Sequence, residues 1–133
     1  MKASDVSALL QLASLQKSKD MAEMRRISIR LGELDTSRDS LGKTAWKELP
    51  RLGADDPAAL AAYGRWSQAT HVWRRRIDAA ETALEAEREA ARTVLRRSFG
   101  QTQALEALQK TAEEEERKAR SRAMERAGQP YED

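Results

Sequence analysis

Cysteine is absent from the 133 residues, which excludes disulfides, thiolate catalysis and cysteine-based metal sites and agrees with a reducing compartment. The single histidine, His71, has no second histidine with which to share a metal ion, and we expect it on or beside the surface. The stretch 53–56 has one glycine and two carboxylates, so it is no phosphate-binding loop. The sequence therefore predicts a protein that is not an enzyme and has no cofactor or metal.

Long apolar runs are also lacking. The N-terminus has no continuous apolar core of the kind found in signal peptides, and no segment is long and apolar enough to span a bilayer. We therefore expect a cytoplasmic protein that does not insert into the membrane. The charges nearly balance, 24 basic against 22 acidic residues, so a nucleic-acid partner is not favoured.

Aromatic residues are scarce, at 5%, whereas 35% of the chain is charged. A compact core would need more large apolar residues than these, but each helix of a two-helix hairpin needs only one apolar stripe. The abundance of Ala, Glu, Arg, Leu and Lys is typical of long helices and coiled coils. This composition predicts an all-α fold.

Stop signals gather at a single place in the chain. Pro50 cannot continue a helix, and Asp56 followed by Pro57 has the form of an N-cap and a first helical residue. We therefore predict one domain over 1–133, an antiparallel coiled-coil hairpin with a longer second helix. Its parts are a helix over 4–48, a turn over 49–56, a helix over 57–126 and a flexible tail over 127–133.

Heptad spacing marks one stripe on each predicted helix, as in a left-handed coiled coil. The first stripe comprises Val6, Leu10, Ala13, Lys17, Asp20, Met24, Ile27, Leu31, Leu34, Arg38, Leu41 and Ala45. The second comprises Tyr63, Trp66, Thr70, Trp73, Ile77, Ala80, Leu84, Glu87, Ala91, Val94, Ser98, Gln101, Leu105, Leu108 and Ala112. The polar pair Lys17 and Asp20 predicts a shift of register, with Leu9, Leu12 and Leu15 competing for the seam. Pairing outward from the turn would match helix one with about residues 57–106.

Four of the six aromatic residues lie near the predicted turn: Trp46, Tyr63, Trp66 and Trp73. They could serve only to close the end of the hairpin. However, three tryptophans are more than two helices can bury, and exposed aromatic residues on a rigid element are typical binding anchors. Some aromatic surface near the turn should therefore remain exposed and available to a partner.

The sequence resembles the family of the flagellar export protein FliJ and its virulence-secretion counterparts. The resemblance covers most of the chain: a leucine-rich start at 9–13, the polar helix with Met24-Arg25-Arg26, the aromatic segment Tyr63-Gly64-Arg65-Trp66-Ser67-Gln68-Ala69 and a charged terminal helix from Glu113 to Arg126. This chain is shorter than a typical member, mainly in helix one and the turn.

The resemblance implies a coiled-coil stalk of a type III protein export apparatus, which serves flagellum biogenesis and hence chemotaxis. Its partners would be the export ATPase ring, the cytosolic domain of the export gate and export chaperones. It would be cytoplasmic and peripherally associated with the inner face of the membrane. The gate-contacting positions correspond to Trp66, Thr70, Trp73 and Ile77, although only Trp66 matches the family in residue type. From the aromatic cluster and this resemblance together, we predict that Trp66 is a binding anchor.

Two other functional classes compete with this interpretation. A generic coiled-coil scaffold would have the same stripes without aromatic residues gathered at one end. A helical arm that binds nucleic acid would need a basic face, which the balance of charges does not favour.

Overall fold

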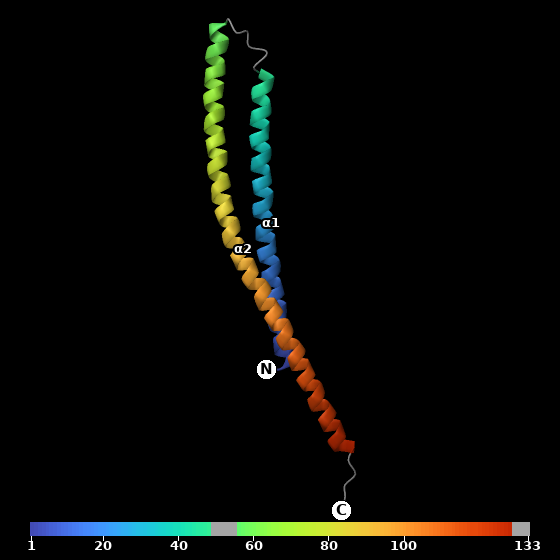
Figure 1. Cartoon of the computed structure of the whole chain (residues 1–133). Helices are drawn as coiled ribbons and strands as arrows, with labels where there is room; N and C mark the ends of the chain where they lie inside the picture. The colour runs from blue at the N-terminus through green and yellow to red at the C-terminus, as the bar shows by residue number, and fades with distance from the viewer. Residues whose placement is uncertain (49–55, 129–133) are drawn as a thin grey trace, which may run out of the picture. The chain divides into compact units, whose positions relative to one another are not determined.

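The computed structural model describes residues 1–48 and 56–128, with the side chains of 44–48 left out of that description. It contains two helices, α1 over Ala3–Glu48 and α2 over Pro57–Gly128, of 46 and 72 residues (Figure 1). The helices pack against each other, which confirms the predicted all-α two-helix hairpin with a longer second helix. The predicted turn, apart from Asp56, lies outside the described residues.

The ends of the helices agree with the sequence signals. Asp56 caps α2, because the backbone N–H of Ala58 donates to Asp56 Oδ1 at 3.0 Å and Pro57 is the first helical residue. α2 continues through Ala127 and Gly128, which the sequence assigned to the tail; differences of this size are usual at fraying ends. No helix in the described ranges is long and apolar enough to cross a membrane.

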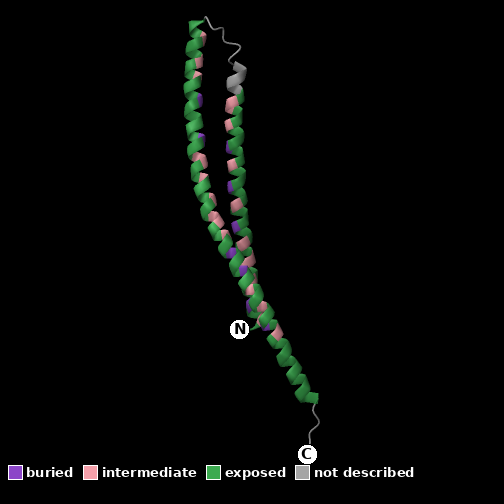
Figure 2. Ribbon diagram, in the orientation of Figure 1, coloured by how far each residue is buried: buried purple, intermediate pink, exposed green. Residues whose placement is uncertain are grey.

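The chain forms two compact units, and each helix contributes to both. We call Met1–Ala22 with Thr93–Asp133 the terminal unit, and Glu23–Arg92 the central unit. In each unit, the buried and half-buried residues lie on the sides of α1 and α2 that face each other (Figure 2). One narrow seam per unit is what thin helical pairs provide, and it matches the sparse supply of apolar residues.

The seam of the terminal unit is partly polar. Val6 is buried at one end, while Asp20, Ser98 and Thr102 are buried farther along the seam. Ser98 Oγ donates to Asp20 Oδ2 across the seam, and Thr102 Oγ1 donates to the Ser98 carbonyl at 2.9 Å. No buried side-chain nitrogen or oxygen in the described part of the chain lacks a hydrogen-bond partner. Hydrogen bonds within the protein therefore compensate these buried polar groups for the hydration that they lose on folding.

The expected shift of register at Lys17 and Asp20 is wrong. Both residues stay in the seam: Asp20 accepts from Gln16 Nε2 at 3.0 Å and from Ser98, and Lys17 Nζ lies 5.0 Å from the centre of the Phe99 ring. Hydrogen bonds thus satisfy the Asp20 carboxylate within the seam, and Lys17 is only half-buried, so both polar residues are tolerated on this face. Leu12 consequently remains exposed on another face of α1.

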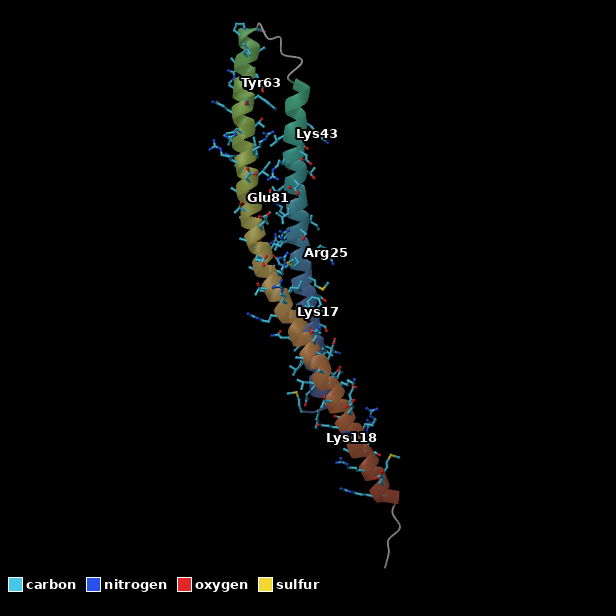
Figure 3. The ribbon with its side chains drawn as sticks, in the orientation of Figure 1. Lys17, Arg25, Lys43, Tyr63, Glu81 and Lys118 are labelled. Carbon is cyan, nitrogen blue, oxygen red and sulfur yellow. The ribbon has the colours of Figure 1, made fainter. Side chains whose placement is uncertain are left out.

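The pairing of the terminal unit also extends farther along α2 than 57–106. The backbone N–H of Ala3 donates to Glu116 Oε1 at 3.0 Å, and Ala112 is buried. The interhelical bond between Asp20 and Ser98 fixes this alignment, which the apolar pattern alone did not specify. Beyond it, every residue from Arg117 to Gly128 is exposed, and side chains such as Lys118 project into solvent (Figure 3).

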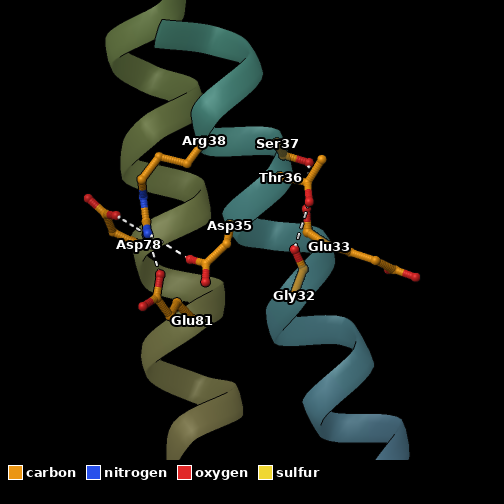
Figure 4. Close-up of polar contacts among 8 residues, drawn as sticks. All are labelled: Gly32, Glu33, Asp35, Thr36, Ser37, Arg38, Asp78 and Glu81. Atoms are coloured by element: carbon orange, nitrogen blue, oxygen red, sulfur yellow. Dashed lines mark hydrogen bonds and ion pairs between the residues drawn. The ribbon is translucent and has the colours of Figure 1, made fainter.

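The central unit combines apolar and ionic contacts. Ile27, Leu34 and Ile77 are buried in its seam. Arg38 of α1 reaches across to α2, where it donates to Asp78 Oδ1 at 2.8 Å and to Glu81 (Figure 4). These two hydrogen bonds, the one to Glu81 foremost, raise the pKa of Arg38.

Ion pairs at the surface of the central unit lie mainly within one helix. Arg26 donates to Glu23 at 2.7 Å, and this hydrogen bond lowers the pKa of the Glu23 carboxyl. A lowered pKa means that the pair favours the folded state above the ordinary carboxyl range, and that this contribution is lost as the pH falls through the lowered value. Arg26 also lies 3.4 Å from Glu87 of α2, but both groups are half exposed, so solvent screens the attraction.

Candidate protein-binding groove

The four residues predicted to bind a partner all lie in the central unit, but they differ in exposure. Thr70 and Ile77 are buried in the seam, with exposed fractions of 8% and 7%. Trp66 is half-buried, and Trp73 is 55% exposed. A partner could therefore reach Trp73 and part of Trp66 directly, whereas Thr70 and Ile77 support the seam from within.

Trp73 lies at the edge of the seam, and its neighbour Arg74 reaches toward α1. The guanidinium Nη2 of Arg74 lies 4.0 Å from the point that a Cβ on Gly42 would occupy, which is ordinary contact distance. With position 74 facing α1, the indole of Trp73 is turned toward the flank of the helical pair.

A groove of about 530 Å³ runs along this flank. Its apolar surface comes from both helices, with Leu34 and Leu41 on α1 and Trp66, Trp73 and Ile77 on α2. The remaining lining residues are polar and all belong to α1: Arg30, Glu33, Thr36, Ser37 and Ser40. An apolar floor with a polar rim on one side is the usual composition of a small protein-binding site.

The aromatic side chains in this region are held by neighbours on their own helix. The rings of Tyr63 and Trp66 lie 5.9 Å apart and are tilted by 31°. The guanidinium of Arg76 lies 5.5 Å from the centre of the Trp73 ring. Contacts of this kind restrict the ring orientations, which reduces the entropy lost when a partner covers them.

On the rim, Arg30 and Glu33 form an ion pair of 3.0 Å within α1. Ser37 Oγ donates to the Glu33 carbonyl at 3.0 Å, which keeps the hydroxyl close to the helix (Figure 4). The rim therefore offers one positive side chain, one negative side chain and several hydroxyl groups, so it has hydrogen-bonding groups but no strong net charge. It suits a partner surface of mixed polarity better than a strongly acidic or basic one.

Sequence reasoning found the aromatic residues of this groove but missed its rim. Arg30, Glu33, Ser37 and Ser40 repeat at intervals of three and four residues, each one position before a residue of the α1 seam. That flanking stripe was the available signal, since residues beside a coiled-coil seam border any groove along it. The predicted place of Trp46 in the aromatic cluster concerns a side chain outside the described residues.

The described residues offer few other chemical groupings. They include no cluster of three or more His, Cys, Asp or Glu residues that could hold a metal ion. His71 is exposed, as expected, and borders a shallow hollow on α2 with Ser67, Gln68, Val72 and Arg75. Comparison with protein-family models, curated proteins and solved structures finds no match to this chain.

Proposed function

We propose that this chain is a non-catalytic helical adaptor of a flagellar type III protein export apparatus. In this role it links the export ATPase to the cytosolic domain of the export gate, and it escorts export chaperones. It is then cytoplasmic and reaches the inner face of the membrane only through the apparatus. The resemblance to the FliJ family supports this proposal, and the groove provides the binding surface that it needs.

The observation that carries the proposal is the exposed indole of Trp73 beside the half-buried Trp66. Tryptophan is enriched among the residues that dominate binding energy, and this exposed indole belongs to a contiguous apolar groove rather than standing alone on the surface. A generic scaffold would need only its seam. Here an apolar groove opens along the flank of the seam, and one of its residues, Trp66, belongs to the aromatic segment that carries the family resemblance.

The test is to titrate variants of the full chain against the soluble domain of the export gate and, separately, against the export ATPase. We expect Trp73→Ala to weaken binding to the gate by about thirtyfold, since losing a buried aromatic anchor costs about 2 kcal/mol. Because the indole is 55% exposed in the free protein, helicity and melting temperature should change little. Trp66→Ala should weaken the same interaction and also lower the melting temperature, because Trp66 is half-buried.

Val72→Ala is the matched control, since Val72 precedes Trp73, is 43% exposed and does not line the groove. It should bind the gate like the wild type, and stimulation of the ATPase should be the same in all three variants. Wild-type affinity of the Trp73→Ala chain would contradict the groove as the gate-binding site. Failure of the wild-type chain to bind either protein would contradict the proposed function itself.

A further inference from the structure

A second apolar surface lies in the terminal unit, on a face of α1 outside the seam. Leu9, Leu12 and Leu15 are 43%, 64% and 68% exposed. Spaced three residues apart, they form a continuous leucine face rather than scattered single residues. None of the three is among the residues buried between α1 and α2.

The residues on this face are arranged symmetrically about Leu12. Leu9 and Leu15 lie three residues to either side of it. Asp5 and Lys19 lie seven residues to either side, so the heptad spacing puts them on the same line of the helix as Leu12. Both charged residues are exposed, and neither forms an ion pair within the described part of the chain. The face is thus apolar at its centre, acidic at one end and basic at the other.

We propose that this leucine face binds a second copy of the same chain, with the two α1 segments antiparallel about a two-fold axis at Leu12. A two-fold axis requires a self-complementary surface, in which residue i meets residue j and j meets i. Here Leu12 meets Leu12 of the second copy, and Leu9 meets its Leu15. Asp5 meets Lys19 of the second copy, and Lys19 meets its Asp5.

The charges select the antiparallel orientation over the parallel one. In a parallel pair, Asp5 would face a second Asp5 and Lys19 a second Lys19, which is repulsive at both ends. The contact runs from Asp5 to Lys19, which is 15 residues of each helix or roughly 22 Å of helix length. That is at the small end of specific interfaces, so association should be reversible and in the micromolar range, about 8 kcal/mol.

Sedimentation equilibrium of the full chain tests this proposal. Over about 1 µM to 1 mM, which spans moderate to weak affinities, the apparent mass should rise from 15.0 kDa toward twice that value. Leu12→Lys should remain at the monomer mass throughout, because it places two ammonium groups against each other at the axis. Leu60→Lys is the control, since Leu60 is similarly exposed, at 56%, but belongs to the central unit. It should assemble like the wild type, and circular dichroism should show equal helicity in all three chains.

A charge exchange tests the orientation. Asp5→Lys and Lys19→Asp should each weaken self-association by about tenfold, because each converts two attractive pairs into repulsive ones. The double variant D5K/K19D restores opposite charges across the axis and should regain most of the wild-type affinity. Loss of the acidic residue from the first turn of α1 also weakens the helix slightly. The double variant keeps that defect, so recovered assembly cannot be a folding effect.

Three results would overturn the proposal. They are a monomeric wild-type chain across the whole concentration range, unchanged assembly of Leu12→Lys, and a double charge variant that assembles no better than the single ones. None of these measurements involves an export protein, so their outcome is independent of the proposed function.

Discussion

At the scale of single residues, the terminal unit contains a buried hydrogen bond between the Ser98 hydroxyl and the Asp20 carboxylate. A carboxylate in an apolar seam loses the hydration that it had in the unfolded chain. Here Ser98 and Gln16 donate hydrogen bonds that replace part of that hydration. A buried polar pair also fixes which residues face each other, because sliding the helices would leave the carboxylate without its partner.

Ser98→Ala should therefore lower the free energy of unfolding by about 1.5–3 kcal/mol, the range for hydrogen bonds to charged groups. Urea unfolding followed by circular dichroism measures this change. Ser121→Ala is the control, because Ser121 lies on the exposed end of α2 and its loss should be nearly neutral. Replacing both partners, as in Asp20→Leu with Ser98→Ala, should recover the loss, since no buried charge then remains. A double variant less stable than Ser98→Ala would contradict this account.

At the scale of helices, the seam of α1 was predictable from sequence because apolar residues mark most of it. Val6, Ile27 and Leu34 are buried where the heptad spacing put them. Even Lys17 and Asp20 keep the spacing, although their polarity suggested otherwise. Their partners on α2, Phe99 and Ser98, supply the explanation, and they cannot be recognised from the pattern of one helix.

The seam of α2 was only half predictable. The line through Ile77, Leu84, Ala91, Ser98, Leu105 and Ala112 was correct, and all of these residues are buried or half-buried. The seam has a second line of residues, which was predicted to run through positions 80, 87, 94, 101 and 108. The buried and half-buried residues lie one position later: Glu81, Arg88, Leu95, Thr102 and Gln109. The prediction chose residues such as Val94 for the seam because they are apolar, but Val94 is 46% exposed. Interhelical pairing decided otherwise, as Glu81 bonds to Arg38 of α1.

The same dependence on the facing helix explains what sequence revealed of the groove. The aromatic residues were visible as a cluster, but their exposure was not. Thr70 and Ile77 lie on the correct line and are buried, whereas Trp73 lies beside the seam and is 55% exposed. Which tryptophan is accessible thus depends on how α2 is turned toward α1, which the pattern of α2 alone did not specify.

Adjacent substitutions in the terminal unit test this register. Leu95→Asp should lower the free energy of unfolding by about 2 kcal/mol or more, because it puts a carboxylate into the seam without a partner. Val94→Asp should change it by less than about 0.5 kcal/mol, since that side chain is largely exposed. Urea unfolding of the two variants gives both values. The reverse order would restore the register predicted from sequence alone.

At the scale of the whole molecule, the two apolar surfaces belong to different units. The groove is lined by residues between Arg30 and Leu41 and between Trp66 and Ile77 of the central unit, and the leucine face lies within residues 9–15 of the terminal unit. They share no residue. The net charge of only +2 gives neither surface a strong long-range field. Each surface is therefore expected to select its partner by local shape and by the few charges beside it.

Substitutions at the two surfaces should accordingly have separate effects. Leu12→Lys should abolish self-association yet bind the soluble domain of the export gate like the wild type. Trp73→Ala should do the opposite. Gate binding is best measured with the chain below its dimerisation concentration, because a dimer could gain apparent affinity by engaging two sites at once. Combining the substitutions should give each effect at its single-variant size, as expected for sites that share no residue. If Leu12→Lys weakens gate binding under these dilute conditions, the leucine face belongs to the gate-binding surface, and the assignment of one partner to each unit is wrong.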